Sequence, residues 1–269
     1  MLAVALLAAA CASSRRGIEL PDGGGVPLPD HSAFWERVAA PCRGVRTMEF
    51  LLVLGGRSGD TTLRRTRMRA AAERSGSLRI EALAPFGAPL FVFVARDDSA
   101  TLLLPRDGQV VHGARPAEVL HALAGLALAP ADVHALLTGC LAPDPVATAA
   151  RRHPDGSVTV ELEGGAAAYV RGADGEQVVA AGRRGDLTVE YSEHVRGLPR
   201  RLRIRMDGPR GGADLTGTLS RVSMNITLHP AVFEVDVPAD YTPVSLSGLR
   251  GGSPLEQASP PAGDAAARP

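Results

Sequence analysis

The side chains that most often carry catalysis are scattered along this chain of 269 residues. The cysteines form no CxxC motif and the histidines no HExxH motif or close pair, so the sequence predicts no metal site. Ser58 follows Gly56, but Asp60 stands where the nucleophile elbow of a hydrolase requires glycine. The histidines are at positions 31, 112, 121, 134, 153, 194 and 229.

Two further patterns of reactive residues also fail to indicate catalysis. The glycine clusters lack the lysine of a phosphate-binding loop, because the chain contains no lysine at all. Glu161 and Glu163 form a carboxylate pair by spacing, and the alternative, two exposed positions on a strand, is the simpler interpretation. We therefore expect a protein that is not an enzyme and has no cofactor and no metal, but acts as a container or a scaffold.

The composition limits the classes of partner and the kind of core. Lys+Arg and Asp+Glu both total 29, which gives a formal net charge of +0 and argues against a general nucleic-acid binder. The apolar fraction of 45% excludes a wholly disordered chain. Aromatic residues make up only 4%, so the core must be built mainly from leucine, valine and alanine.

The first elements expected after the N-terminal region are a helix and a hairpin. The spacing of Phe34, Trp35 and Val38 predicts a short helix over residues 31–40, ended by Pro41. Strand-forming residues predict a strand over 45–54, a glycine-rich turn over 55–60 and a returning strand over 62–73.

The rest of the chain reads as short strands interrupted by two helices. Residues 77–83 alternate between apolar and charged side chains, which is typical of a strand with one buried face. Helices are predicted to begin at Pro116 and Pro130, and Gly139 to end the second. Further strands are expected over 89–95, 100–104, 109–112, 157–162, 166–171, 177–181, 187–191, 200–206, 214–219 and 222–228. Some eleven or twelve short strands indicate a single curved antiparallel sheet or barrel.

The N-terminal region indicates a secreted, lipid-anchored protein. Residues 1–10 are an uncharged apolar run that fits a lipoprotein signal peptide. Leu7, three alanines and Cys11 resemble a bacterial lipobox, in which the cysteine is acylated. The alternative is an alanine-rich start without that role. We expect a lipidated flexible tether over 11–30, a folded domain over 31–248 and a disordered tail over 249–269.

The order of several extended motifs resembles the LolA/LolB superfamily of lipoprotein carriers and outer-membrane receptors. The segments that carry the resemblance are 78–87, with its apolar-Pro-apolar-Gly loop, the strands 90–95 and 102–104, the helical pair 113–140, the strand 197–204 and the ending 233–238. Together they span about residues 34–240.

The resemblance implies a mainly β fold with a helical lid, an incomplete antiparallel β-barrel of about eleven strands covered by helices. It implies a monomer on the periplasmic face of the outer membrane, anchored through its lipid. Such a protein binds the acyl chains of lipoproteins or other lipids, receives them from a LolA-like periplasmic carrier and helps insert them in the membrane. The alternative is an envelope lipoprotein that uses the same fold as a sensor or structural partner-binding module.

Thirteen apolar positions are candidates for the wall of the acyl-chain cavity. The alternative for each is that it belongs to an ordinary packed core. They are Phe50, Leu52, Met68, Leu78, Ile80, Phe91, Phe93, Leu102, Leu104, Leu120, Leu123, Leu136 and Met224.

The loop Pro85-Phe86-Gly87 is a candidate for membrane contact. An aromatic side chain in a tight Pro-x-Gly turn has no evident packing role, and the resemblance implies an apolar side chain here that touches the acceptor membrane. The alternative is a phenylalanine folded back on the sheet.

The three cysteines have two different expected roles if the lipobox is processed. Cys11 is then the lipidation site, which leaves Cys42 and Cys140 as a predicted disulfide in an oxidising periplasm.

Overall fold

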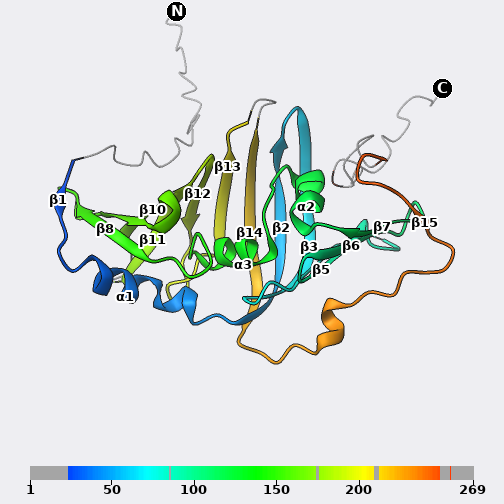
Figure 1. Cartoon of the computed structure of the whole chain (residues 1–269), viewed down its shortest axis with the longest axis horizontal. Coiled ribbons are helices and arrows are strands. Elements are labelled where there is room, and N and C mark those ends of the chain that lie inside the picture. The colour runs from blue at the N-terminus through cyan, green and yellow to red at the C-terminus, as the bar shows by residue number, and fades with distance from the viewer. Residues whose placement is uncertain (1–23, 85, 174–175, 209–211, 249–254, 256–269) are drawn as a thin grey trace, which may run out of the picture.

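The computed structural model describes residues 24–84, 86–173, 176–208, 212–248 and 255, and these residues form one wide sheet with three α-helices on one side (Figure 1). The helices are α1 (His31–Arg43), α2 (Pro116–Ala124) and α3 (Pro130–Thr138), with short 3-10 turns η1 (Glu163–Gly165) and η2 (Pro230–Phe233). The strands are β1 (Val26–Pro27), β2 (Thr47–Ser58), β3 (Thr61–Glu73), β4 (Leu78–Ala82), β5 (Phe91–Arg96), β6 (Ser99–Leu104), β7 (Gln109–Ala114), β8 (Ala147–Arg152), β9 (Val158–Leu162), β10 (Ala166–Ala173), β11 (Glu176–Arg184), β12 (Leu187–Ser192), β13 (Arg201–Met206), β14 (Ala213–Met224) and β15 (Thr242–Pro243).

The sheet consists of two antiparallel meanders joined at one pair of strands. Strands β2 to β7 pair in chain order, as do β8 to β14, and β14 closes against β2 to make one sheet. At the outer edges β1 pairs with β8, and β15 lies parallel to β7. The edges do not meet, so the mainly β, open antiparallel architecture that the sequence predicts is confirmed.

The strand count and several boundaries differ from the sequence-based expectation. Fifteen strands are present among the described residues, against the eleven or twelve expected, because β1, β8 and β15 have no alternating apolar pattern to mark them. The sequence predicts a flexible tether over 11–30, yet Val26–Pro27 within it pairs with Arg151–Arg152 of β8. The strands expected over 214–219 and 222–228 are one strand, β14, with a register shift after Ser220.

The glycine pair of the first hairpin is part of a strand and not of the turn. β2 continues to Ser58, and the register against β3 shifts between Leu54 and Gly56. Gly56 has a φ of +147°, and a Cβ there would lie 2.1 Å from the carbonyl oxygen of Asp214. Only glycine permits this close approach of β14, so the glycine marks a β-bulge.

Helix α1 runs past Pro41 to Arg43, so the prediction that proline ends it at residue 40 is wrong. Proline removes one helical hydrogen bond, and the last turn is held by other contacts. The disulfide of Cys42 with Cys140, whose Cα atoms are 5.7 Å apart, ties it to the residues after α3. The Trp35 indole donates a 2.9 Å hydrogen bond to the Pro145 carbonyl, so α1 is fixed to this segment at two places.

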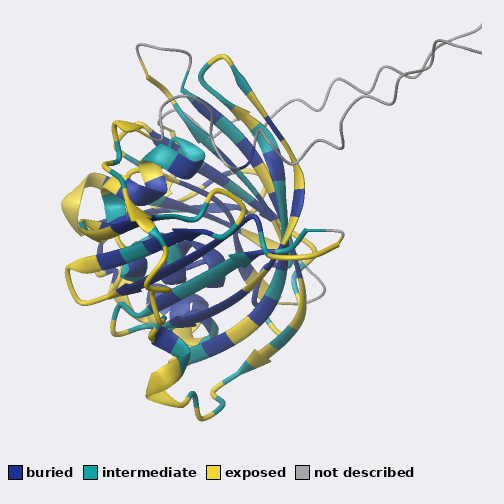
Figure 2. Cartoon of the chain, turned by 90° about the vertical axis from the view of Figure 1, so that its right-hand side faces the viewer, coloured by how far each residue is buried: buried dark blue, intermediate teal, exposed yellow. Residues whose placement is uncertain are grey.

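The two faces of the sheet bury different apolar clusters. The main core lies between the inner face and the helices, where α1 packs on β8 and β11, α2 on β6, and α3 on β3. A smaller cluster on the outer face joins Val92, Val94 and Leu103 to Phe233 of η2. Buried and exposed positions accordingly alternate along many strands (Figure 2). None of the helices in the described ranges is long and apolar enough to span a membrane.

The disulfide predicts a measurable contribution to stability. The bridged residues are 98 apart in sequence, and a cross-link over so long a loop restricts the unfolded chain strongly. We expect the double substitution Cys42→Ser and Cys140→Ser to lower the free energy of unfolding by about 2–4 kcal/mol in urea denaturation. A thiol assay on the oxidised protein tests the bridge itself, and two reactive thiols at these positions would contradict it.

Candidate functional site

An apolar cavity of about 100 Å³ lies between the inner face of the sheet and the helices. Its floor comes from β2, β3, β4, β5 and β13, and its roof from α2, α3 and the link between them. Every side chain that lines it is apolar. The lining residues are Phe50, Leu52, Leu54, Met68, Ala70, Leu78, Ile80, Phe91, Leu120, Leu123, Ala124, Leu126, Leu128, Val133, Leu136, Leu137, Leu202, Ile204 and Leu255.

The floor of the cavity follows from strand alternation and one small side chain. Side chains of a strand point alternately to opposite faces, so Leu78 and Ile80 face inward while Arg79 and Glu81 face outward. Ala70 of β3 pairs with Phe50 of β2 on one side and with Ile80 of β4 on the other. An alanine between two large side chains leaves unfilled space above it, which is where the cavity lies.

The roof is shaped by the ends of two short helices. Both α2 and α3 begin with proline and are followed by a glycine in the left-handed conformation, Gly125 and Gly139, which reverses the chain. The link after Gly125 directs Leu126 and Leu128 into the cavity. Asp132 at the start of α3 forms a 2.7 Å ion pair with Arg184 of β11, so this helix is fixed to the sheet.

The structure brings nine of the thirteen predicted positions into this cavity. The other four lie elsewhere: Phe93, Leu102 and Leu104 are buried in the main core, and Met224 packs at its edge. Ten lining residues were not predicted, chiefly those of the helix link, α3 and β13. Leu126, Leu128, Val133 and Leu137 lie in the helical region already identified, so their apolar character was the available signal.

Phe86 lies in the loop after β4 with 90% of its surface exposed, so it does not fold back on the sheet. The neighbouring Gly87 has a φ of +76°, a turn conformation that favours glycine. Pro85 and Cys11 lie outside the described residues. The phenyl ring of Phe86 is therefore accessible to another surface.

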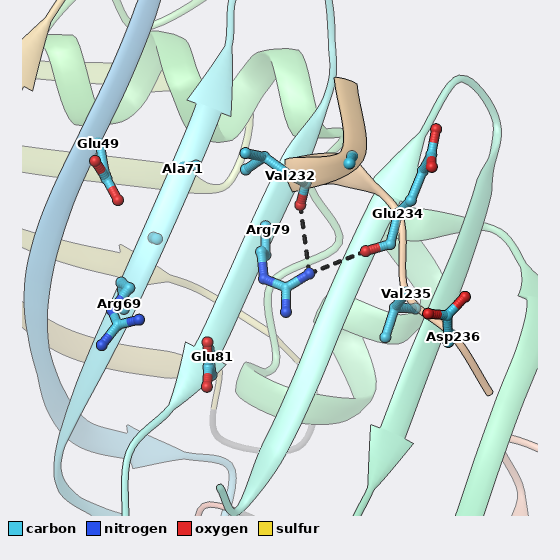
Figure 3. A pocket seen from close by; sticks show the side chains of 11 residues that line it. Glu49, Arg69, Ala71, Arg79, Glu81, Val232, Glu234, Val235 and Asp236 are labelled. Atoms are coloured by element: carbon cyan, nitrogen blue, oxygen red, sulfur yellow. Dashed lines mark hydrogen bonds between the residues drawn. The ribbon is translucent and has the colours of Figure 1, made fainter. Parts of the chain in front are cut away.

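The outer face carries the charged residues. A hollow of about 470 Å³ lies there between β2–β4 and residues 231–236, with four carboxylates and two arginines around it (Figure 3). Arg79 donates hydrogen bonds of 3.3 and 3.1 Å to the carbonyls of Val232 and Glu234, which hold the C-terminal segment on the sheet. Arg203 and Arg205 on β13 form ion pairs with Asp214 and Glu190. None of these charged side chains lines the apolar cavity.

Two buried polar groups next to the core have no hydrogen-bond partner among the described residues. The Tyr191 hydroxyl is one, and burial raises the pKa of that group. The other is Nε2 of His134 on α3, whose side chain shares a small hollow with Arg43, Arg74 and Asp144. Burial, with the nearby Arg74 charge second, lowers the pKa of His134 to about 4. Neither group lines the apolar cavity.

The cavity has a lining that suits apolar groups. It has no lining side chain that can donate a proton, act as a nucleophile or hold a cation. Within the described ranges no three His, Cys, Asp or Glu side chains gather into a group that fits a metal ion. An all-apolar cavity selects hydrocarbon groups, because any polar group placed there would lose its hydrogen bonds to water.

Comparisons with known proteins bear on the fold alone. No protein-family model and no curated protein sequence matches the chain. Among solved structures, the chain is similar to a LolA superfamily protein from Nitrosomonas europaea, with 10% identity, 74% of this chain and 96% of that chain covered, and a TM-score of 0.48. An outer-membrane lipoprotein-sorting protein domain from Vibrio parahaemolyticus shows 8% identity, coverage of 73% and 94%, and a TM-score of 0.44. The lipoprotein LppX from Mycobacterium tuberculosis shows 13% identity, coverage of 75% and 99%, and a TM-score of 0.32.

The buried imidazole of His134 predicts a loss of stability in mild acid. Its pKa is about 4 in the folded protein against 6.5 for the free side chain, so between these values the unfolded state binds more protons. The contribution of His134 to the free energy of unfolding is therefore fully present above pH 6.5 and is lost as the pH is lowered towards 4. We expect a loss of about 2 kcal/mol between about pH 7 and pH 4.5, measured by urea unfolding.

The variant His134→Phe isolates this contribution, because phenylalanine cannot take up a proton. His194 also has a pKa lowered by burial and contributes in the same pH range, so part of the dependence persists in the variant. The expected result is a flatter stability profile between pH 4.5 and 7 than in the wild type. Identical profiles for the two proteins would contradict the assignment.

Proposed function

We propose that this protein is an outer-membrane-anchored lipoprotein that binds the acyl chains of lipoproteins in its apolar cavity and helps to receive or insert them in the outer membrane. The observation that supports the proposal is the all-apolar cavity that lies between the sheet and its helical roof. The anchor in this proposal is lipid on Cys11, and the protein faces the periplasm. The Cys42–Cys140 disulfide fits such an extracytoplasmic compartment.

Transfer through such a site requires no covalent chemistry. Each methylene of an acyl chain removed from water contributes roughly 0.8 kcal/mol, so a long chain binds an apolar site strongly. A chain then passes from carrier to receptor to membrane if its free energy is lower at each successive site. The partners implied are an acylated lipoprotein, a LolA-like periplasmic carrier and the membrane surface.

The exposed loop after β4 is the proposed place at which lipid passes to the membrane. Phe86 follows β4, the strand that supplies Leu78 and Ile80 to the cavity. We infer that Pro85, Phe86 and Gly87 form the part of the protein that inserts among the lipids of the acceptor membrane. The phenyl ring is then removed from water only when the membrane is present, so delivery and membrane contact are coupled.

Filling the cavity from its floor is expected to abolish lipid binding. In Ala70→Leu the larger side chain projects into the space between Phe50 and Ile80. We expect the affinity for fluorescently labelled palmitate to fall by about tenfold or more. The matched control is Ala167→Leu, since Ala167 lies half-buried on β10, away from the cavity. Unchanged affinity in a folded Ala70→Leu protein would rule out this cavity as the lipid site.

Replacing Phe86 is expected to separate binding from delivery. Phe86→Glu removes an exposed ring, so the thermal unfolding temperature and the affinity for palmitate stay as in the wild type. Transfer of an acylated lipoprotein to phospholipid vesicles is expected to fall at least about tenfold, because a carboxylate resists insertion into the bilayer. Phe86→Leu keeps transfer, and Val26→Glu, at a site 71% exposed at the sheet edge, controls for the added charge. Normal transfer by Phe86→Glu would refute the role of the loop.

A cellular measurement distinguishes sorting from the alternative role of a sensor or structural module. Depletion of a sorting receptor causes lipoproteins to accumulate away from the outer membrane. Correct localisation of lipoproteins after depletion, together with lipid-free purified protein, would favour the alternative.

A further inference from the structure

One residue beyond the sheet reaches into the cavity. Leu255 lies seven positions after Gly248, the last residue of the continuous C-terminal part of the described chain. Its side chain is 2% exposed, belongs to the main core cluster and lines the cavity with residues of the floor and the roof. It is the only member of the cavity wall that comes from outside the sheet and the helical region.

The sequence around Leu255 shows that its burial is specific. From Gly251 to Pro269 there is no other Leu, Ile, Val, Met or aromatic residue, so the segment has a single strongly apolar side chain. That side chain is the one placed in the cavity. A branched aliphatic group of this kind is chemically equivalent to a short piece of acyl chain.

The size of the remaining space points to the same conclusion. About 100 Å³ is unfilled with Leu255 in place, whereas pockets for small molecules typically measure about 300–1,000 Å³. The cavity as described therefore has too little free volume for a long acyl chain unless one of its lining side chains moves away. Leu255 is the lining group that lies outside both the sheet and the helical region of the described structure.

We propose that Leu255 occupies the acyl-chain site as an internal ligand and that a bound lipid must displace it. The proposal rests on the proposed function, because it assumes that the cavity takes hydrocarbon. The unloaded protein keeps its cavity apolar and nearly filled without cargo. The apparent dissociation constant for lipid is then the dissociation constant of the empty cavity divided by the fraction of molecules in which Leu255 lies outside it.

The first test measures how strongly Leu255 competes. In the full chain with Cys11→Ser, Leu255→Asp replaces the aliphatic group with a charge that the cavity excludes. We expect labelled palmitate to bind about tenfold more tightly than to the wild type, which corresponds to about 1.4 kcal/mol. Val237→Asp, at a side chain 41% exposed in the C-terminal segment, is the control for the added charge. Equal affinity of Leu255→Asp and the wild type would overturn the proposal.

The second test reads the position of residue 255 without relying on lipid affinity. The substitution Leu255→Cys introduces a thiol in a chain whose Cys42 and Cys140 are bridged and whose Cys11 is replaced by serine. We expect this thiol to react with a maleimide at least about tenfold more slowly than one introduced by Val237→Cys, and saturating palmitate to remove the protection. Equal rates of the two thiols without lipid would overturn the proposal.

The two tests distinguish failure of this inference from failure of the proposed function. Palmitate that binds the wild type while the thiol of Leu255→Cys stays protected overturns displacement alone. Absence of palmitate binding to the wild type and to Leu255→Asp overturns both the proposed function and the displacement.

Discussion

The fold depends on the need to bury the inner face of a very wide sheet under a small helical cover. The two meanders are joined only through β14 and β2, and together they present inward apolar side chains from almost every strand. Against this surface the described chain sets three α-helices, of 13, 9 and 9 residues. Interiors are normally filled to crystal density, so a position such as Ala70, where floor and roof do not meet, leaves a cavity.

The contacts that hold the roof are concentrated on one side. The disulfide ties α1 to the residues after α3, and the Asp132–Arg184 ion pair ties the start of α3 to β11. By contrast, the only ion pair of α2 in the described structure, Arg115–Glu118, lies within its own first turn. The covalent and ionic links of the roof therefore lie at α1 and α3, whereas α2 contributes apolar side chains to the cavity wall.

The sequence predicts the fold class and much of the cavity floor, and the residues that it misplaces show why it stops there. Alternation predicts that Leu78 and Ile80 lie on the inner face of the sheet. It does not predict which inward side chains border the cavity, so Phe93 and Leu102, expected in its wall, lie in the packed core. Gly55 and Gly56 resemble a turn locally, and only the approach of Asp214 from a distant strand makes them a bulge. Leu255 has no periodic pattern around it, since a single apolar residue in a proline- and glycine-rich tail owes its burial entirely to tertiary structure.

Strand β4 connects the two features on which the proposed function depends. Ile80 lines the cavity and Phe86 lies six residues further along the chain, a span of at most about 20 Å in extended conformation. Over the same stretch Arg79 and Glu81 point to the outer face, where Arg79 donates hydrogen bonds to two carbonyls of the C-terminal segment. Under the proposed function, an acyl chain that leaves the cavity beside β4 has only this short stretch to cross before it reaches the loop. Phe86 is exposed at that end, so in the proposed delivery step a membrane in contact with the loop lies within reach of the chain and the path through water is short.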